Sequence, residues 1–284
     1  MIYISPHIDI ESSFYKWFLY YFPSCKYETP SKLNDDDLLI RYSPLGFLPI
    51  EGKQLSLYTD SIYEDYNTLF YNAYINDINS INQSLKYSTF RMFTKKEYYN
   101  KYKHYGTAEI LDIPINKKIY KKMNASELRQ KYNINTNLKV GIWMGNTSPI
   151  KGFDLFLKYF NDNNDIFWII ILDTHHDNIA FTNNENILVH NTITGEIMPE
   201  LFDSEKITAE LLNCADFFLS TNRTNNYFYS ELKAVSCDIP IIKFNIDKYD
   251  FEHIDISLLK DYETDEIDIK NKWEELFLKW GIKW

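Results

Sequence analysis

Short apolar runs alternate with longer amphipathic segments along the whole chain, and this alternation constrains the fold more than any other feature. The clearest apolar runs lie at residues 138–145, 167–173, 215–221 and 239–244. Residues 167–173 (FWIIILD) are apolar up to the last position, as expected of a strand that is buried on both faces. Strands separated by helices form parallel sheets. The pattern therefore predicts an α/β protein with parallel sheets.

The first half repeats this alternation in shorter runs. Residues 1–5, 37–43 and 54–60 are predicted strands, and residues 10–22 form a predicted helix with aromatic side chains at helical spacing. Polar residues end the second and third of these strands. Ligands bind at such carboxyl ends in open α/β sheets.

A junction between two domains is predicted near Pro114, which precedes a lysine-rich helical segment. Two halves of this length are each large enough for a Rossmann-like domain. We therefore predict an N-terminal domain of residues 1–114 and a C-terminal domain of residues 115–284.

The charge balance limits the classes of partner. The chain has 284 residues, of which 30 are basic and 40 are acidic, so its formal net charge is −10. Nucleic-acid binding needs clustered Lys and Arg to neutralise phosphates, and only four of the basic residues are Arg. The composition therefore argues against nucleic acid as a partner.

Cysteine content and hydropathy predict a cytoplasmic protein. The three cysteines are too few and too scattered for a disulfide framework. No uncharged apolar run approaches the roughly 18 residues of a membrane-spanning helix, and the first residues lack the features of a signal peptide. His175 and His176 lie beside two aspartates, but adjacent loop residues seldom direct both rings at one ion. We therefore expect no metal site.

The commonest nucleotide and hydrolase motifs are absent from the sequence. No glycine precedes Gly46, so no glycine-rich dinucleotide fingerprint follows the first strand. The sequence also lacks a P-loop, a nucleophile elbow and an HExxH motif. A functional site must therefore be sought in less common motifs at the strand ends.

The second half carries several motifs of a known family in the family's order. Gly145, Lys151 and Gly152 keep the spacing of its Gly-Arg-Leu, three residues, Lys-Gly segment. A second family segment aligns ungapped with residues 215–242, and its matches are Ala215, Asp216, Arg223, Ala234, Cys237 and Pro240. The chain thus resembles the GT-B glycosyltransferases of the large retaining group called glycosyltransferase family 4.

This resemblance implies a GT-B fold, with two Rossmann-like domains whose parallel sheets face a central cleft. It implies a glycosyltransferase that moves a sugar from a nucleotide-sugar donor to a glycan or another hydroxyl acceptor. The donor is expected on the C-terminal domain and the acceptor on the N-terminal one. Transfer is expected to retain the anomeric configuration, without a metal and with no cofactor besides the donor.

The chain departs from the family at its signature carboxylates. The family's two glutamates, which are separated by seven residues, fall on Asn225 and Lys233, and the arginine beside the first glycine is Asn146. Glu231 lies near the second position, but two helix positions turn a side chain by about 200°, so it is expected to face elsewhere. Donor binding is therefore either rebuilt or lost.

Lys151 is the leading candidate for a catalytic role. It lies between a strand end and a helix amino terminus, where backbone N–H groups favour an anion. A lysine there could neutralise the diphosphate as it leaves. Gly145 and Asn146 begin the same loop and are predicted donor-binding residues. The alternative is a solvated lysine.

The loop from Arg223 to Ser230 is the second candidate segment on the donor side. Arg223 is a predicted catalytic cation, and the helix amino terminus that follows could bind a diphosphate through backbone amides. The predicted donor-binding residues of this loop and helix start are Asn225, Asn226, Phe228, Tyr229 and Ser230. Such residues are equally common in surface turns and cores.

Four residues of the first half are candidates on the acceptor side. Tyr42 and Thr59 end predicted strands, and His7 lies in the first loop after a strand. Asp60 is a predicted catalytic residue that could accept or orient the acceptor hydroxyl. A helix N-cap is the alternative for Asp60, and a surface position is the alternative for His7.

Two alternative functions remain open at this stage. In the first, a degenerate GT-B protein that lost the glutamate pair binds a glycan or supports an active partner. In the second, the enzyme transfers sugar to DNA bases as some phage GT-B enzymes do, which the net charge of −10 disfavours.

Overall fold

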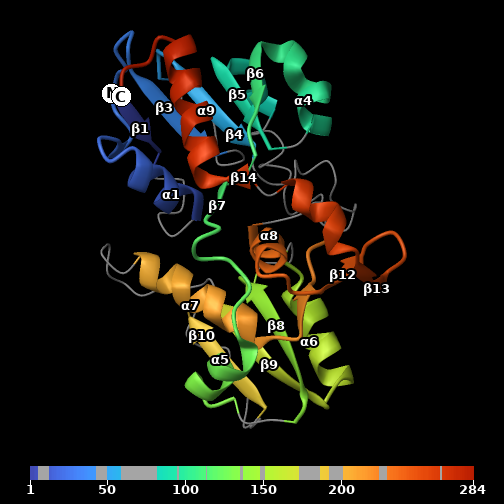
Figure 1. The fold of residues 1–284 in the computed structure, drawn as a ribbon. Helices are drawn as coiled ribbons and strands as arrows, with labels where there is room; N and C mark the ends of the chain where they lie inside the picture. Colours follow the sequence, from blue (N-terminus) through green and yellow to red (C-terminus); the bar gives the residue numbers. More distant parts are fainter. Residues whose placement is uncertain are drawn as a thin grey trace. The chain divides into compact units, whose positions relative to one another are not determined.

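The chain forms two compact units in the computed structural model (Figure 1). Unit 1 comprises Met1–Pro114 with Thr264–Trp284, and unit 2 comprises Ile115–Glu263. The structure describes residues 1–5, 13–42, 50–58, 82–94, 96–112, 114–134, 137–147, 151–172, 186–191, 201–223, 229–262 and 264–284.

Unit 1 is built on a six-stranded sheet in the order β2-β1-β3-β4-β5-β6, and each pairing in it is parallel. Its strands are β1 (Ile2–Ile4), β2 (Lys26–Tyr27), β3 (Leu38–Tyr42), β4 (Gln54–Tyr58), β5 (Phe90–Phe93) and β6 (Thr107–Ile110). The described helices along these strands are α1 (Ser13–Tyr21), α4 (Lys96–Tyr102) and the 3₁₀ helix η2 (Lys103–Tyr105).

Unit 2 is built on a second six-stranded sheet in the order β10-β9-β8-β11-β12-β13. Its strands are β8 (Lys139–Gly145), β9 (Ile166–Leu172), β10 (Ile187–Asn191), β11 (Phe217–Ser220), β12 (Ile241–Asn245) and β13 (Asp250–Ile254), the last of which is antiparallel to β12. Its described helices are α5 (Ala125–Lys131), α6 (Phe153–Asp162), α7 (Leu201–Cys214), α8 (Tyr229–Ser236) and η4 (Ile256–Tyr262).

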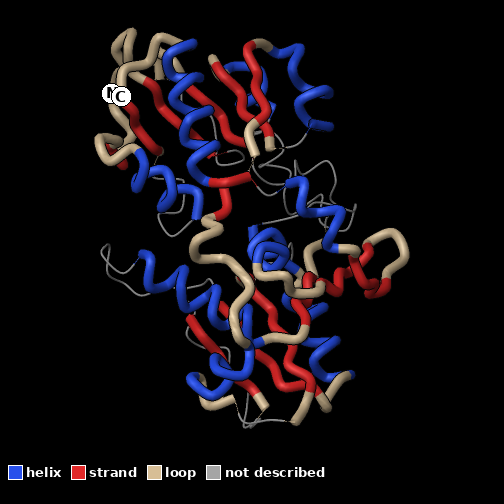
Figure 2. Tube along the Cα trace, in the orientation of Figure 1, coloured by secondary structure: helices blue, strands red, loops and turns tan. Residues whose placement is uncertain are grey.

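Strands alternate with helices over much of the described chain, as the trace coloured by secondary structure shows (Figure 2), although β2, β3 and β4 follow one another without a described helix. This confirms the predicted α/β class with two Rossmann-like sheets, which are parallel except for β13. The alternation follows from burial: β9 buries Ile169, Ile170 and Ile171 completely, so both of its faces must be covered. α6 covers one face through Phe156, whose ring centroid lies 5.4 Å from that of Trp168.

The end of the chain belongs to unit 1, which corrects the prediction that residues 115–284 form one domain. Helix α9 (Glu266–Lys279) places Ile269, Trp273 and Phe277 in the apolar core around β1, β3 and β4. The Trp273 ring meets Phe18 of α1 edge to face, at 5.2 Å between centroids. Chain order alone does not show which core an amphipathic helix joins, and α9 is buried in the core of unit 1.

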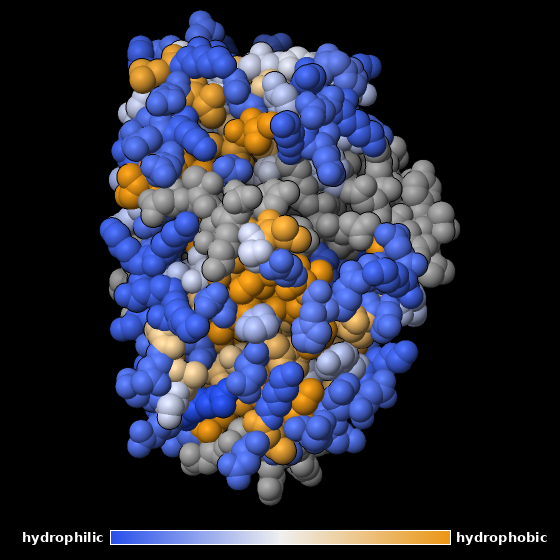
Figure 3. Space-filling view, turned by 45° about the vertical axis from the view of Figure 1, so that its right-hand side comes forward, coloured by the Kyte–Doolittle hydropathy of each residue, from blue (hydrophilic) through white to orange (hydrophobic). Residues whose placement is uncertain are grey.

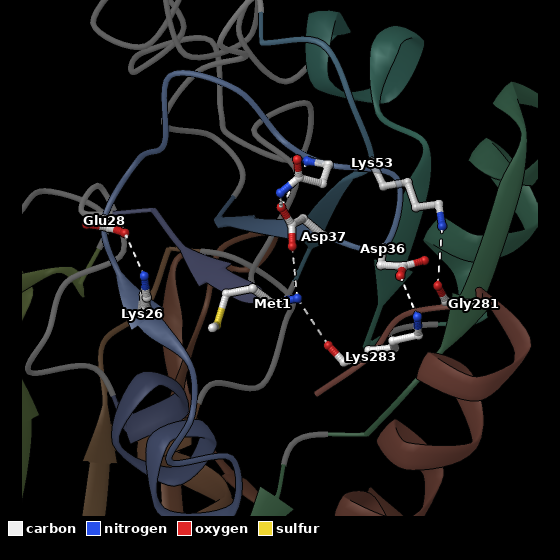
Figure 4. Close-up of polar contacts among 9 residues, drawn as sticks. Met1, Lys26, Glu28, Asp36, Asp37, Lys53, Gly281 and Lys283 are labelled. Atoms are coloured by element: carbon white, nitrogen blue, oxygen red, sulfur yellow. Dashed lines mark hydrogen bonds and ion pairs between the residues drawn. The ribbon is translucent and has the colours of Figure 1, made fainter.

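Polar contacts hold the chain ends together in unit 1 (Figure 4). The Met1 ammonium donates to Asp37 Oδ1 at 2.9 Å and to the Lys283 carbonyl at 3.2 Å. Lys283 Nζ lies 2.7 Å from Asp36 Oδ2, and Lys53 Nζ donates to the Gly281 carbonyl at 3.4 Å. These contacts fix the segment after α9 beside the amino ends of β1 and β3.

A two-stranded sheet of β7 (Pro114–Ile115) and β14 (Thr264–Asp265) lies where the chain passes from one unit to the other. The first crossing of the chain between the units falls within β7, and the second falls immediately before β14. The predicted junction at Pro114 lies in its first strand.

The visible surface is mainly hydrophilic, with smaller apolar areas between the polar side chains (Figure 3). Large exposed apolar side chains include Tyr249, Leu258 and Leu278. Each helix in the described ranges is too short or too polar to cross a membrane.

Candidate functional site

The strand order of unit 2 contains one point at which the chain changes direction across the sheet. β8 and β11 are parallel neighbours, with Phe218 paired to Ile142. From β8 the chain continues outward through β9 and β10, whereas from β11 it continues through β12 on the other side. Ligands in open α/β sheets bind outside the carboxyl ends of strands at such a switch point. The segments after β8 and β11 therefore define the candidate site.

The two segments are joined by direct contacts. Thr221, the first residue after β11, donates from its hydroxyl to the Lys151 carbonyl at 2.6 Å. Its Oγ1 accepts a hydrogen bond from Trp143 Nε1 of β8 at 2.8 Å. The structure thus brings Lys151 to the end of β11, 70 residues away in sequence.

Gly152 permits this close approach. Its φ is +65°, in the left-handed region that favours glycine, and a Cβ atom there would lie 2.0 Å from the Thr221 carbonyl oxygen. Gly145 lies on the other side of the loop, where an added Cβ would be 3.6 Å from Lys151 Cβ. Both glycines of the family motif therefore lie beside Lys151, which is half-buried, as is Asn146.

Arg223 is buried and forms a bidentate ion pair with Asp154 in the first turn of α6. Arg223 Nη1 donates to Asp154 Oδ1 at 2.7 Å, and Nη2 contacts Oδ2. This pairing lowers the pKa of Asp154 below its ordinary value, mainly through the hydrogen bonds from Arg223. The carboxylate is therefore charged and the pair is intact at neutral pH. It would be lost only as the pH falls through that lowered pKa.

A buried polar network lies under the start of α8. Ser220 of β11 and Lys243 of β12 are register partners, so their side chains leave the sheet on the same face. Glu231 of α8 is 0% exposed and lies 3.3 Å from Lys243 Nζ through its Oε1. Ser220 Oγ donates to the same oxygen and accepts from Asn222 Nδ2 at 3.3 Å.

Lys233 lies on a different side of α8 from Glu231, as the helical spacing predicts. Its Nζ lies 3.0 Å from Glu205 Oε1 of α7 and lies over the rings of Tyr120 and Tyr229, at 4.8 and 5.3 Å from their centroids. Tyr120 donates its hydroxyl to Glu205. Burial raises the pKa of this phenol well above 10, so it stays protonated and keeps donating.

This arrangement bears on the position where the family has its second glutamate. A glutamate at 233 would face the carboxylate of Glu205 in a buried place, which costs free energy through like-charge repulsion. The lysine therefore forms an ion pair that joins α8 to α7. Simply restoring the family residue would break that pair.

The electrostatics of the site are set by matched pairs. The three buried cations Arg223, Lys233 and Lys243 each contact a carboxylate, on Asp154, Glu205 and Glu231 respectively. Burying an ion is costly unless it is paired. Lys151 is half-buried, and its backbone carbonyl accepts the hydrogen bond from Thr221.

Of the remaining predicted donor-side residues, Tyr229 and Ser230 form the first turn of α8 and are half-buried. Asn225, Asn226 and Phe228 lie outside the described residues. On the acceptor side, Tyr42 ends β3, and the other three predicted residues, His7, Thr59 and Asp60, also lie outside the described part of the chain.

Sequence reasoning missed three residues that shape this site: Asp154, Glu205 and Thr221. Each was passed over because its partner lies far away in sequence; Asp154 and Arg223, for example, are 69 positions apart. An acidic residue in the first turn of a helix is usually explained by the helix dipole alone. In the described part of the chain, no three His, Cys, Asp or Glu side chains come together to hold a metal ion.

Comparison with known proteins identifies the fold through structure alone. No protein-family model matches the sequence, and no curated protein is significantly similar to it. Among solved structures, sucrose-phosphate synthase from Thermosynechococcus elongatus aligns over 72% of this chain and 55% of its own, with a TM-score of 0.51 and 11% identity.

Anabaena HepE gives a similar result. Its complex with UDP and glucose covers 85% of this chain and 80% of the HepE chain, with a TM-score of 0.51 and 11% identity. Its complex with UDP-glucose covers 72% and 59%, with a TM-score of 0.51 and 10% identity. The chain therefore spans less than two thirds of the first two matched structures. These neighbours are GT-B glycosyltransferases, and the chain shares their fold of two Rossmann-like domains.

Proposed function

We propose that the protein is a glycosyltransferase that takes its sugar from a nucleotide-sugar donor. The observation that carries this proposal is the position of Lys151, which lies at the switch point of a parallel sheet and is joined to the end of β11 by Thr221. The GT-B fold supports it, and HepE, one of the structural neighbours, has been solved with UDP-glucose.

In the proposed reaction, the acceptor hydroxyl oxygen forms a bond to the anomeric carbon of the sugar. The bond from that carbon to the β-phosphate oxygen breaks, the acceptor hydroxyl proton passes to the carboxylate of Asp60 in this proposal, and the nucleoside diphosphate leaves with an added negative charge. Lys151 and the backbone N–H groups at the amino terminus of α8 would stabilise this charge. Holding donor and acceptor in line would supply much of the remaining rate enhancement.

The donor side of the proposed site is the carboxyl edge of the unit 2 sheet. It includes Gly145 and Asn146 before Lys151, and Tyr229 and Ser230 at the start of α8. Asn225, Asn226 and Phe228 complete the proposed donor set. The acceptor is proposed on unit 1, near His7, Tyr42, Thr59 and Asp60. Retention of configuration and independence of a metal are proposed on the family resemblance alone.

Lys151→Ala is expected to lower turnover about 100-fold, because it removes the positive charge that would stabilise the leaving diphosphate. Lys158→Ala is the matched control, since Lys158 is an exposed lysine farther along the helix that follows Lys151. The measurement is sugar release or transfer, by mass spectrometry, from a panel of UDP- and GDP-sugars. Equal turnover in Lys151→Ala and the control would remove Lys151 from the mechanism.

A glycan-binding or partner-supporting module is the second candidate function. The pairing of Lys233 with Glu205 favours it, because the family's carboxylate position is occupied by a lysine that is engaged elsewhere. Calorimetry with UDP and UDP-glucose separates the two candidates. If the protein binds neither UDP nor UDP-glucose at millimolar concentration and releases no sugar from any donor, the binding-module function replaces the enzyme function.

A further inference from the structure

Three contacts in succession join the loop that ends at α6 to the segment that follows β11. The Lys151 carbonyl accepts from Thr221, the Gly152 backbone lies against the Thr221 carbonyl, and Asp154 pairs with Arg223. These contacts run in the same order along both segments. They form a clamp, defined here as Lys151, Gly152 and Asp154 on one side with Thr221 and Arg223 on the other.

The ion pair is the strongest polar contact of the clamp. Bidentate arginine–carboxylate pairs fix direction as well as distance, because two parallel hydrogen bonds hold the two planar groups together. The side chain of Arg223 is 10% exposed, whereas that of Asp154 is 64% exposed. The guanidinium is therefore buried just beyond the end of β11, and Asp154 attaches α6 to it from the surface.

The position of the Lys151 ammonium depends on this attachment. A lysine side chain is long and flexible, so its charge can be directed only if its backbone is fixed. Thr221 fixes the Lys151 carbonyl, and the ion pair fixes the first turn of α6 three residues later. Without the pair, Thr221 would still hold the Lys151 carbonyl, but the first turn of α6 would lose its contact with Arg223.

We propose that Asp154 is a positioning residue, which acts through Arg223 to hold the loop of Lys151 against the end of β11. Arg223 then contributes by anchoring this loop. The inference rests on the proposed function in one respect, namely that Lys151 meets the diphosphate of the donor.

The first test requires no ligand. In Asp154→Asn, which keeps the shape of the side chain and removes its charge, hydrogen exchange is expected to rise at least about tenfold in the first turn of α6 and at the end of β11. Asp162→Asn is the matched control, an exposed acid at the end of the same helix, and should leave both segments unchanged. Unchanged exchange in a folded Asp154→Asn would overturn the clamp.

The second test asks whether Asp154 affects UDP binding by positioning Lys151. Binding of UDP is measured by calorimetry for the wild type, Asp154→Asn, Lys151→Ala and the double variant. We expect Asp154→Asn to weaken UDP binding about tenfold in the wild-type background and less than twofold in the Lys151→Ala background, because coupled residues are not additive.

Equal losses in both backgrounds would overturn the positioning role, since a general loss of stability would weaken UDP binding whether or not Lys151 is present. If the wild type binds neither UDP nor UDP-glucose, the proposed function fails and the positioning role fails with it. The exchange measurement would still decide whether the ion pair holds the loop. The two failures are therefore distinguishable.

Discussion

Replacing Gly152 with alanine is expected to lower the free energy of unfolding of unit 2 by about 3 kcal/mol. Two costs add. The backbone φ of +65° is strained for any residue with a Cβ atom, and that atom would lie 2.0 Å from the carbonyl oxygen of Thr221. Because the obstacle is backbone, no side-chain rotation relieves the clash. Lys151 and Thr221 must separate instead.

Gly281→Ala provides a control with the same backbone conformation and open space. Its φ is +64°, and the nearest atom to an added Cβ is Lys53 Nζ at 3.9 Å. Only the conformational cost of about 1 kcal/mol is expected. Urea unfolding with hydrogen exchange of peptides from each unit measures both variants. Equal losses in the two would show that contact with Thr221 adds nothing.

The two central strands β8 and β9 of unit 2 could be predicted almost to the residue because their apolar runs are continuous, whereas β13 (Asp250–Ile254) was not predicted. The run at residues 167–173 became β9 (Ile166–Leu172), and the run at 138–145 became β8 (Lys139–Gly145). A strand that is covered on both faces admits few polar residues, so its limits are visible in the sequence. Its neighbours in the sheet follow less directly from the sequence.

Other features of the fold could not be predicted from the sequence, because a charged residue interrupts the apolar run or because chain order does not give the placement. β5 (Phe90–Phe93) has four buried residues but includes Arg91, whose Nε donates to the Leu85 carbonyl inside unit 1. With one charge among only four residues, the run has too few apolar positions to predict a buried strand. α9 has the amphipathic pattern of a helix, but the pattern does not say which unit buries it.

The loops of the candidate site could be predicted from the sequence, whereas its ion pairs could not. Lys151 and the start of α8 follow from where strands end. The partners Asp154 with Arg223 and Glu205 with Lys233 depend on which helices flank the switch point. Ion pairs between elements far apart in sequence are set by topology, and local pattern carries no signal for them.

Lys243→Met is expected to destabilise unit 2 by about 4 kcal/mol, because it leaves a buried carboxylate without its cation. Glu231 is 0% exposed, and Lys243 Nζ lies 3.3 Å from it. Methionine fills much of the volume of the lysine stem, so the main loss is electrostatic. Urea unfolding of unit 2 measures the effect. Lys248→Met, in the exposed pair with Glu252, should cost little by comparison.

The double variant Glu231→Leu/Lys243→Met separates the cost of an unpaired charge from the cost of lost packing. Replacing a buried ion pair by apolar side chains of similar size is often nearly neutral, because neither charge then has to be desolvated. We expect the double variant to recover at least about half of the stability lost in Lys243→Met. Ser220 limits the recovery, since its hydroxyl also loses the Glu231 oxygen that it contacts. A double variant less stable than Lys243→Met would mean that Glu231 supports the fold mainly through Ser220, and the ion pair would then lose its assigned role.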